Sequence, residues 1–499
     1  MGDSSGAGGI TAYGAYIPRL RLARSAILKA NAWANGALAA HGKGERSMCN
    51  WDEDSVTMAV EAARDALGDT DRAQIRAVHL ASTTLPFSDR QNAGIVAEAL
   101  NLGQSIGTLD ITSSQRAGTT GLVNALNTVS AGAGTVLFCA AEHRRSQTGS
   151  PQELLYGDGA AALTLGTENV IARLLAAHTL SVDFVDHYRG QHAEFDYDWE
   201  ERWIRDEGYL KVVPEAIRRA LAKGGLAVAD IDRLVMPCVL RRVPESVAGM
   251  AGLAKEVVAD NLQAVCGDTG AAHAIVLLCH ALEQARPGQK LMVAGFGQGC
   301  DVLVFEVTEA IASLAPRRGV SGSLARRAPE ENYDRFLTFN NLVAKDFGKR
   351  GEADKQTALT TLYRNRKMLT GFVGGRCTQC GTVQFPKAHY CVNPNCGALD
   401  TQADHPMADV PGKVNTWTAD SLTFSIDPPA YFGMVQFEGG GRLMVDFTDV
   451  DKARFDIGAQ VRMQFRVREF DPDRGFRKYF WKAVQADAAA GETGKSKAA

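Results

Sequence analysis

Residues 10–310 alternate short apolar runs with alanine-rich stretches at helical spacing. The β-branched and apolar run at residues 75–82 predicts a strand, and a second run at residues 135–139 predicts another. Between them, small and apolar residues at 92–100 recur with the spacing of one helix face. This succession of strand, helix and strand predicts an α/β architecture.

The pattern of the first half of this region returns in its second half. Three pairs of segments correspond: residues 77–83 with 233–238, 134–140 with 290–295, and 156–165 with 296–305. In the last pair, an aromatic residue and two glycines form a turn before a hydrophobic run, beginning at Tyr156 and at Phe296. Because these turns are 140 residues apart, the pattern indicates a duplicated domain rather than a solenoid repeat.

The C-terminal part of the chain has a different pattern. Turns separate β-rich runs that predict a small barrel, at residues 412–424, 430–438, 442–446 and 460–468. Turn-forming and charged residues interrupt the hydrophobic periodicity after the duplicated region. The predicted parts are two halves of a duplicated body at 10–170 and 171–310, a linker at 311–344, a helix with a cysteine-rich segment at 345–400, and a barrel at 401–486.

Composition and charge exclude several classes of protein. Hydrophobic residues make up 45% of the 499 residues, which is enough for ordinary globular cores. The 54 basic and 57 acidic residues nearly balance, so we expect no nucleic-acid partner, although small barrels can bind single strands through basic and aromatic residues. Nowhere do 18 apolar residues follow one another, and the N-terminal residues lack a basic and apolar signal. We therefore expect a cytoplasmic protein without membrane contact.

The ten cysteines fall into two groups. Six are scattered, mostly in apolar runs, and are expected to be small buried side chains in a reducing compartment: Cys49, Cys139, Cys238, Cys266, Cys279 and Cys300. The other four, Cys377, Cys380, Cys391 and Cys396, have the spacing C-x2-C-x10-C-x4-C. Two such thiolate pairs form a tetrahedral site that suits Zn²⁺, and four protein ligands leave no open position for catalysis. The sequence therefore predicts a structural zinc ion.

Three motifs connect the duplicated region with a known family: Gly157-Asp-Gly-Ala-Ala161, Tyr13-Gly-Ala-Tyr-Ile-Pro-Arg19 and Gly267-Asp-Thr-Gly-Ala-Ala272. Together with the duplication, they resemble the thiolase superfamily, in particular 3-hydroxy-3-methylglutaryl-CoA (HMG-CoA) synthases and type III ketoacyl synthases. Residues 345–485 resemble the zinc-ribbon and OB-fold module of the DUF35 family. The resemblance implies a five-layer α/β/α/β/α body with a zinc ribbon and an OB-fold barrel, a coenzyme A thioester as substrate, and a homodimer or larger oligomer.

The position of the family's nucleophilic cysteine is changed in this chain. When the segment 109–119 is matched on Ala117 and Gly118, that position falls on Gln115. In the superfamily the cysteine lies at the N-terminus of a buried helix, where the helix dipole and backbone amides favour a thiolate and an oxyanion. A carboxamide can donate or accept hydrogen bonds, but it forms no acyl-enzyme.

The resemblance places three further chemical positions on altered residues. The glutamate of the synthases falls near Thr83, and their histidine falls on Pro237 or, with one inserted residue, on Cys238. The asparagine of the glycine-rich motif is Asp268, which is followed five positions later by His273. The candidate catalytic residues are therefore Gln115, Thr83, Cys238, Asp268 and His273.

Three hypotheses remain open for this altered site. In the first, the protein makes or breaks a carbon–carbon bond of a CoA thioester without an acyl-enzyme, by aldol, retro-aldol, Claisen or decarboxylation chemistry. In the second, it is an acyltransferase of the HMG-CoA synthase or thiolase type with Cys238 as the nucleophile. In the third, it is a non-catalytic acyl-CoA-binding scaffold or regulatory subunit. Residues 183–209, rich in carboxylates and aromatic side chains, are either a solvated insertion or a functional segment, namely a substrate lid or a source of acid and base groups.

Overall fold

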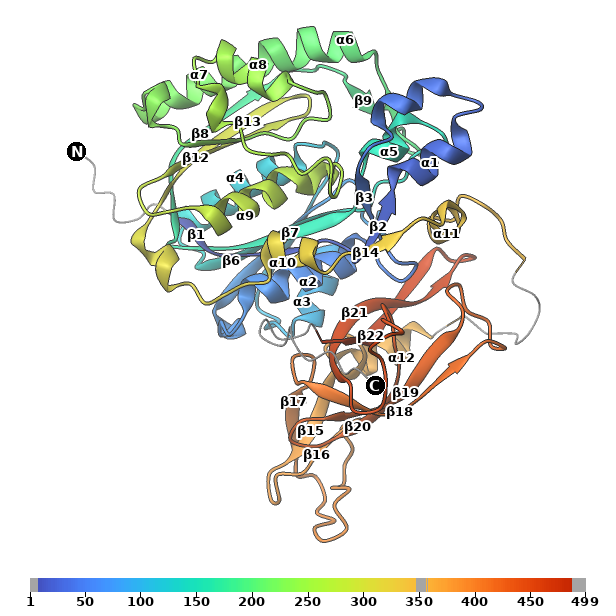
Figure 1. Cartoon of the computed structure of the whole chain (residues 1–499). Coiled ribbons are helices and arrows are strands. Elements are labelled where there is room, and N and C mark those ends of the chain that lie inside the picture. The colour runs from blue at the N-terminus through green and yellow to red at the C-terminus, as the bar shows by residue number, and fades with distance from the viewer. Residues whose placement is uncertain (1–7, 347–355, 357, 487–499) are drawn as a thin grey trace, which may run out of the picture. The chain divides into compact units, whose positions relative to one another are not determined.

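A computed structural model describes residues 8–346, 356 and 358–486 of the chain. The chain divides into two compact units, Met1–Ala344 and Lys345–Ala499. The first unit contains the duplicated region, and the second contains the cysteine-rich segment and the barrel (Figure 1).

The first unit is built on nine strands in one hydrogen-bonded order. The order is β11 (Arg233–Val235), β12 (Lys290–Phe296), β13 (Gly299–Val307), β8 (Ala172–Ser181), β1 (Gly9–Tyr16), β7 (Gly159–Gly166), β6 (Thr135–Glu142), β4 (Ile75–Ala81) and β5 (Gly107–Ile111). In the described residues, two pairs join β1 to β8: Gly9 with Arg173, and Ile10 with Ala172. The sheet folds at this short ladder, so the strands on either side of it form two layers (Figure 1).

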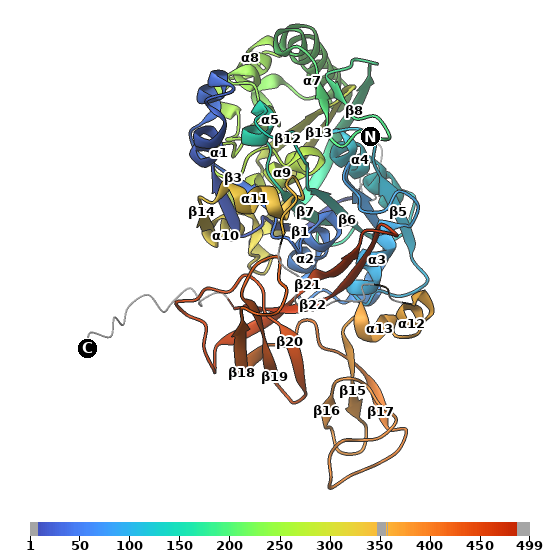
Figure 2. The same cartoon turned by 90° about the vertical axis from the view of Figure 1, so that its right-hand side faces the viewer.

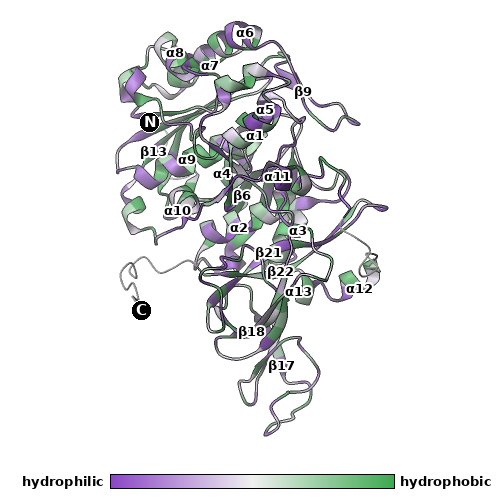
Figure 3. Ribbon diagram, turned by 45° about the vertical axis from the view of Figure 1, so that its right-hand side comes forward, coloured by the Kyte–Doolittle hydropathy of each residue, from purple (hydrophilic) through white to green (hydrophobic). Residues whose placement is uncertain are grey.

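Helices cover the outer faces of these layers and fill the space between them. The three pairs are α2 (Ser55–Leu67) with α3 (Asn92–Ala99), α7 (Leu210–Gly224) with α8 (Val243–Met250), and α4 (Ala117–Ser130) with α9 (His273–Gln284). The first two pairs lie on opposite outer faces, and α4 and α9 lie in the middle. Figure 3 shows hydrophilic and hydrophobic residues around α7 and α8, as expected for helices that bury one face. The five-layer α/β/α/β/α body is thus confirmed.

The strand pairing confirms the duplication. In the first half, β4 is parallel to β6, and β6 is antiparallel to β7. In the second half, β11 is parallel to β12, and β12 is antiparallel to β13. These strands contain the segments that correspond in sequence, so each half repeats the same unit. The predicted strands at 75–82 and 135–139 are β4 and β6, and the predicted helix at 92–100 is α3.

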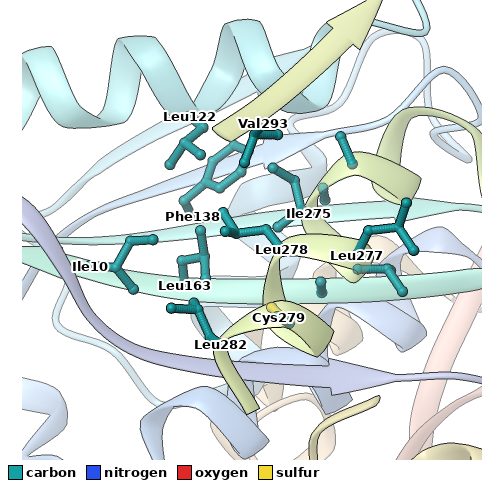
Figure 4. Packing of buried hydrophobic residues seen from close by; sticks show 14 of the residues in the cluster. Ile10, Leu122, Phe138, Leu163, Ile275, Leu277, Leu278, Cys279, Leu282 and Val293 are labelled. Carbon is teal, nitrogen blue, oxygen red and sulfur yellow. The ribbon is translucent and has the colours of Figure 1, made fainter. Parts of the chain in front are cut away.

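The middle helices form much of the main core. In α9, Leu278 and Leu282 lie in one fully buried cluster with Leu122 of α4, Phe138 of β6 and Leu163 of β7 (Figure 4). Burying each such side chain stabilises the fold by roughly 1.5–3 kcal/mol. Although α9 is strongly apolar, it has the length of a core helix, and in the described part of the chain no helix has both the length and the apolar character to cross a membrane.

Two glycines allow loops of the two halves to approach closely. A Cβ on Gly118, in the first turn of α4, would lie 2.1 Å from the carbonyl oxygen of Ala271. A Cβ on Gly157 would lie 1.9 Å from the carbonyl oxygen of Cys266. Because neither position has room for a side chain, the loop 266–272 can pack directly against α4 and against the turn before β7.

The first unit also contains several shorter elements. They are β2 (Leu20–Ala23), α1 (Arg24–Asn31), η1 (Gly36–His41), β3 (Glu45–Met48), α5 (Pro151–Leu155), α10 (Gly319–Ala325), β14 (Ala328–Glu330) and α11 (Tyr333–Phe339). Residues 311–344, which the sequence places in a linker, include the last three of these. Since β14 pairs in parallel with β2, part of this segment is a strand of the first unit.

The second unit contains two small antiparallel sheets (Figure 2). One has the order β16 (Val383–Gln384), β15 (Val373–Cys377) and β17 (Gln402–Pro406); the other has the order β20 (Arg442–Asp446), β19 (Ala430–Phe437), β18 (Gly412–Asp420), β21 (Gln460–Asp471) and β22 (Phe476–Gln485). The second sheet confirms the four predicted β-rich segments and adds β22. Its core is aromatic: the Trp481 ring centroid lies 5.4 Å from that of Phe465 and 5.9 Å from that of Phe372.

Candidate active site and zinc centre

Gln115 lies in the turn that leads into α4. The amide of Ala117 donates to the carbonyl oxygen of Ser114 at 2.9 Å, which closes this turn. Ser113 has a φ of 73°, a left-handed value that non-glycine residues seldom adopt. Gln115 is therefore at the N-terminal end of a helix, where the helix dipole favours a negative charge.

A cavity of about 480 Å³ opens beside this turn, a volume typical of small-molecule sites. Its wall includes Gln115, Arg144 and Tyr156 from the first half and Tyr209, Asp268 and Phe296 from the second half. The cavity thus brings together Gln115 and Asp268 among the residues predicted from sequence. Of the other candidates, Thr83 contacts Gln115, whereas Cys238 and His273 are not part of the wall that the described residues form.

A chain of hydrogen bonds fixes the orientation of the Gln115 amide. Because a carboxylate can only accept, the hydroxyl of Thr83 donates to Oε2 of Glu142 at 3.1 Å. Oγ1 of Thr83 in turn accepts from Nε2 of Gln115 at 3.3 Å. Oε1 of Gln115 is buried and has no hydrogen-bond partner among the described residues. Such an acceptor costs roughly 1–3 kcal/mol, which a hydrogen-bond donor on a ligand would offset.

Glu142, which the sequence analysis did not single out, organises this side of the site. It is the last residue of β6 and is fully buried. Its carboxylate accepts from the backbone amides of Thr83 and Ala271 and from the hydroxyls of Ser82, Thr83 and Thr84. These contacts join the loop after β4 to the loop before α9. The available signal in the sequence is a carboxylate at the end of a buried apolar strand, because a buried charge requires partners.

Asp268 faces the cavity from the loop before α9. Its backbone is bound on both sides: its amide donates to the carbonyl oxygen of Leu155, and its carbonyl oxygen accepts from Gly157, both at 2.8 Å. Oδ1 accepts from the amide of Gly270 at 2.7 Å. The carboxylate is therefore held in place through one oxygen and the main chain.

His273, at the start of α9, is fully buried. Nδ1 lies 3.2 Å from the amide of Thr269, which donates to it, and so this nitrogen carries no hydrogen. Nε2 is then protonated and donates to the carbonyl oxygen of Asn261 at 2.9 Å. With both nitrogens engaged, the ring ties the loop 261–269 to α9.

Cys238 follows β11 and is 1% exposed. Its sulfur lies 3.7 Å from the carbonyl oxygen of Leu240 and is hydrogen-bonded to Tyr209. Burial raises the pKa of the Cys238 thiol to about 12, so the thiol is protonated at neutral pH. Since the thiolate is the reactive form, these surroundings disfavour Cys238 as a nucleophile.

The four cysteines of the second unit meet at one point. Their Sγ atoms lie within 4.8 Å of one another. The distance is 3.9 Å between Cys377 and Cys396, and 3.5 Å between Cys380 and Cys391. A zinc ion with bonds of about 2.3 Å to four thiolates would place the sulfurs roughly 3.8 Å apart. The set therefore fits a tetrahedral zinc ion with a structural role.

Comparisons with known protein families agree with this organisation. Residues 221–304 match the C-terminal domain of 3-oxoacyl-[acyl-carrier-protein] synthase III, residues 371–402 match the ChsH2 rubredoxin-like zinc ribbon domain, and residues 405–466 match the ChsH2 C-terminal OB-fold domain. The predicted resemblance is therefore confirmed, and the zinc-ribbon and OB-fold domains follow in the predicted order.

Two relatives are similar to this chain along nearly their whole lengths. A hydroxymethylglutaryl-CoA synthase of Caldivirga maquilingensis is 28% identical over 346 residues, which cover 67% of this chain and 98% of the relative. One of Methanocella arvoryzae is 29% identical over 322 residues, which cover 62% and 91%.

Solved structures show the same fold at lower identity. An HMG-CoA synthase complexed with CoA has a TM-score of 0.57 at 17% identity and covers 70% of this chain and 92% of that one. The 3-oxoacyl-(acyl carrier protein) synthase III of Pseudomonas aeruginosa PAO1 has a TM-score of 0.54 at 24% identity, with coverage of 60% and 98%. The body is thiolase-like.

Residues 183–209 form part of the cavity wall of this thiolase-like body. Their elements are β9 (His187–Tyr188), β10 (Tyr197–Asp198), α6 (Glu201–Trp203) and η3 (Ile204–Tyr209). Asp196 anchors the segment to the loop after β6 through Arg144 at 2.6 Å, and it also pairs within the segment with Arg189 at 2.8 Å. Burial acts to raise the pKa of Asp196, but attraction and hydrogen bonding by Arg144, with the charge of Arg189, lower it on balance. The ion pair with Arg144 thus fixes this lid segment to the body, where it forms part of the cavity wall rather than a solvated insertion.

Proposed function

We propose that this protein makes or breaks a carbon–carbon bond of a CoA thioester without forming an acyl-enzyme at residue 115. The observation that carries this proposal is the position of Gln115, at the start of α4 and on the wall of a cavity shared with Asp268. Similarity to HMG-CoA synthases, together with a related structure complexed with CoA, supports a CoA thioester as the substrate.

The backbone at the start of α4 supports enolate chemistry. A thioester enolate carries its negative charge on oxygen, and amides at a helix N-terminus stabilise that charge whether residue 115 is cysteine or glutamine. Gln115 then binds the substrate through its unpartnered oxygen. An acyl transfer through residue 115, in contrast, would require a nucleophile there.

Asp268 favours aldol and retro-aldol chemistry over decarboxylation and Claisen chemistry. A carboxylate on the cavity wall can take the proton of a 3-hydroxyl group while the adjacent carbon–carbon bond breaks. The same negative charge would repel the carboxylate group that a decarboxylation substrate carries. A Claisen condensation that proceeds through an acyl-enzyme would again need a nucleophile at residue 115.

The remaining parts of the proposal concern the metal and the assembly. We propose that Cys377, Cys380, Cys391 and Cys396 hold one structural zinc ion, for which their sulfur–sulfur distances are suitable. We also propose a cytoplasmic homodimer. The strand β5, at the end of the described strand order, has a partly exposed Leu109 and offers an edge to a second copy.

The test is to incubate the purified protein with a series of 3-hydroxyacyl-CoA thioesters and to separate the products by liquid chromatography with mass detection. We expect a shorter acyl-CoA and an aldehyde or ketone in equal amounts. An acyl adduct on Cys238 would instead support the acyltransferase hypothesis. Binding of thioesters without turnover of any of them would support a scaffold.

A further inference from the structure

Tyr209 lines the cavity, and it has no part in the steps described so far. It is the last residue of η3, a π-helical turn directly before α7. Turns of this type are rare and are often found at functional sites. The ring of Tyr209 packs on that of Phe296 with centroids 4.2 Å apart, and both residues line the cavity. The packed ring therefore restricts where the hydroxyl can lie.

The hydroxyl of Tyr209 is oriented by Cys238. The S–H group of Cys238 points to the carbonyl oxygen of Leu240, so its sulfur is left to accept from Tyr209. The carboxylates of Asp186 and Asp268, which also line the cavity, act on the phenol electrostatically. Burial, then the neighbouring Cys238 and then these two carboxylates raise the pKa of Tyr209 well above 10. The phenol is thus a neutral proton donor in the same cavity as a carboxylate.

Several other groups that could carry a proton are already engaged. The hydroxyl of Tyr156 is held by the guanidinium of Arg144 at 2.7 Å. Nδ1 of His187 lies 2.9 Å from a carboxylate oxygen of Asp186. Both ring nitrogens of His273 contact the main chain. Within the described part of the chain, Tyr209 donates only to a neutral thiol, whose sulfur is a weak acceptor, so its proton can pass to a substrate more readily than those of these groups.

We propose that Tyr209 is the catalytic proton donor for C2 of a 3-hydroxyacyl-CoA, an assignment that rests on the function proposed above. In the cleavage direction, Asp268 takes the proton of the 3-hydroxyl group. The C2–C3 bond breaks, the 3-hydroxyl carbon becomes a carbonyl, and the electron pair of the bond moves into the thioester as an enolate. Tyr209 gives its proton to C2, and Asp268 returns its proton to the phenolate. One proton moves from oxygen to carbon, and no further reactant is needed.

The experiment compares two tyrosine variants of the full chain. Tyr209→Phe keeps the ring and its packing but removes the hydroxyl. We expect kcat for cleavage to fall by about 100-fold or more, the usual contribution of general acid–base catalysis, while KM and the dissociation constant of the thioester stay about the same. Tyr188→Phe is the matched control, because Tyr188 lies in the same lid segment, is 53% exposed and is outside the cavity wall formed by the described residues.

A second measurement separates proton donation from a structural role. A 2-methyl-3-hydroxyacyl-CoA is cleaved in D₂O, and the configuration of the deuterium at C2 of the product is determined. The wild type should place deuterium on one face, and the residual activity of Tyr209→Phe should place it on both. Wild-type kcat and configuration in Tyr209→Phe would overturn the assignment and leave the proposed function intact. If the wild type cleaves no 3-hydroxyacyl-CoA, the proposed function fails, and this assignment fails with it.

Discussion

The hydroxyl of Thr83 donates to Glu142 rather than to Gln115, and this direction determines which atom of the Gln115 amide remains without a partner. The resemblance to the synthases places their catalytic glutamate near Thr83 in this chain. In the structure a carboxylate does reach that place, but from the end of β6 instead of the loop after β4. The Glu142 carboxylate accepts hydrogen bonds from five groups, so its role in the site is to orient the neighbouring side chains and loops.

Removing the hydroxyl of Thr83 should weaken the site without unfolding the protein. In Thr83→Val, Nε2 of Gln115 loses its acceptor, so the amide is free to rotate. We expect kcat/KM for the thioester to fall about tenfold, the equivalent of one hydrogen bond. Thr83→Ser keeps the hydroxyl and should stay close to the wild type. Steady-state kinetics of both variants, with their melting temperatures, test this; equal losses in the two variants would contradict it.

Replacing Gln115 with cysteine should not increase the native activity. The proposed chemistry uses the amide as a hydrogen-bonding group, so Gln115→Cys removes a contact and adds a nucleophile that the reaction does not need. We expect turnover at or below the wild-type rate. Intact-mass spectrometry of the wild type with substrate should show no acyl adduct. An adduct on any residue of the wild type would show that the reaction is covalent.

The ion pair between Asp196 and Arg144 should make the lid segment sensitive to acid. Because the pKa of Asp196 lies below its usual value of 3.8 in the folded protein, its contribution to stability is complete above about pH 5. That contribution is lost as the pH falls through the lowered folded value. Asp196→Asn leaves Arg144 buried without its partner and should cost about 3 kcal/mol at pH 7.

Urea unfolding of the wild type and Asp196→Asn at pH 7 and at pH 3 measures this effect. The difference between the two proteins should shrink at the lower pH. Glu215→Gln is the control, since Glu215 forms surface ion pairs with Arg218 and Arg219, and its loss should change stability little. A difference for Asp196→Asn that is independent of pH would show that the ion pair is not its cause.

Zinc content provides a test of the second unit. We expect about one zinc ion per chain by elemental analysis, lost when Cys377 and Cys380 are both changed to serine. Metal removal should lower the melting temperature of the second unit, because the four thiolates would then be held together only by the short strands around them. Cys300→Ala, in the first unit, should keep the full zinc content. Retention of zinc by the double variant would place the metal elsewhere.

Local patterns were sufficient to predict most of the fold. The strands β4 and β6 and the helix α3 each have a hydrophobic period that their own residues determine, and the repeat of the glycine turns indicated the duplication. The cysteine spacing is likewise a local pattern, and it was sufficient to predict the four candidate metal ligands. β22 was missed because its residues 476–485 do not alternate between buried and accessible positions: residues 481–484 are all buried, and charged and aromatic residues interrupt any period of two.

The site was harder to predict because its contacts join residues far apart in sequence. Glu142 and Ala271 are 129 positions apart, and neither has a local pattern that indicates the other. The direction of the Thr83 hydroxyl depends on which acceptor lies nearest, which only the folded chain determines. Tyr209 lay at the end of the segment expected to be an insertion or a lid. It is the last residue of a π-helical turn, which no pattern in the sequence indicated.

The short ladder between β1 and β8 bears on the alignment of Gln115 with Asp268. Two residue pairs give the halves few hydrogen bonds within the sheet, so the packing of α4 against α9 and the main-chain bonds of Asp268 to Leu155 and Gly157 set their relative position. Gln115 precedes α4, and Asp268 precedes α9. If α4 slid slightly along α9, the distance between the Gln115 amide and the Asp268 carboxylate would therefore change. We thus expect a volume change at a core residue of α9 such as Leu278, which does not line the cavity in the part of the chain that the structure describes, to alter the reaction by shifting Asp268 relative to Gln115.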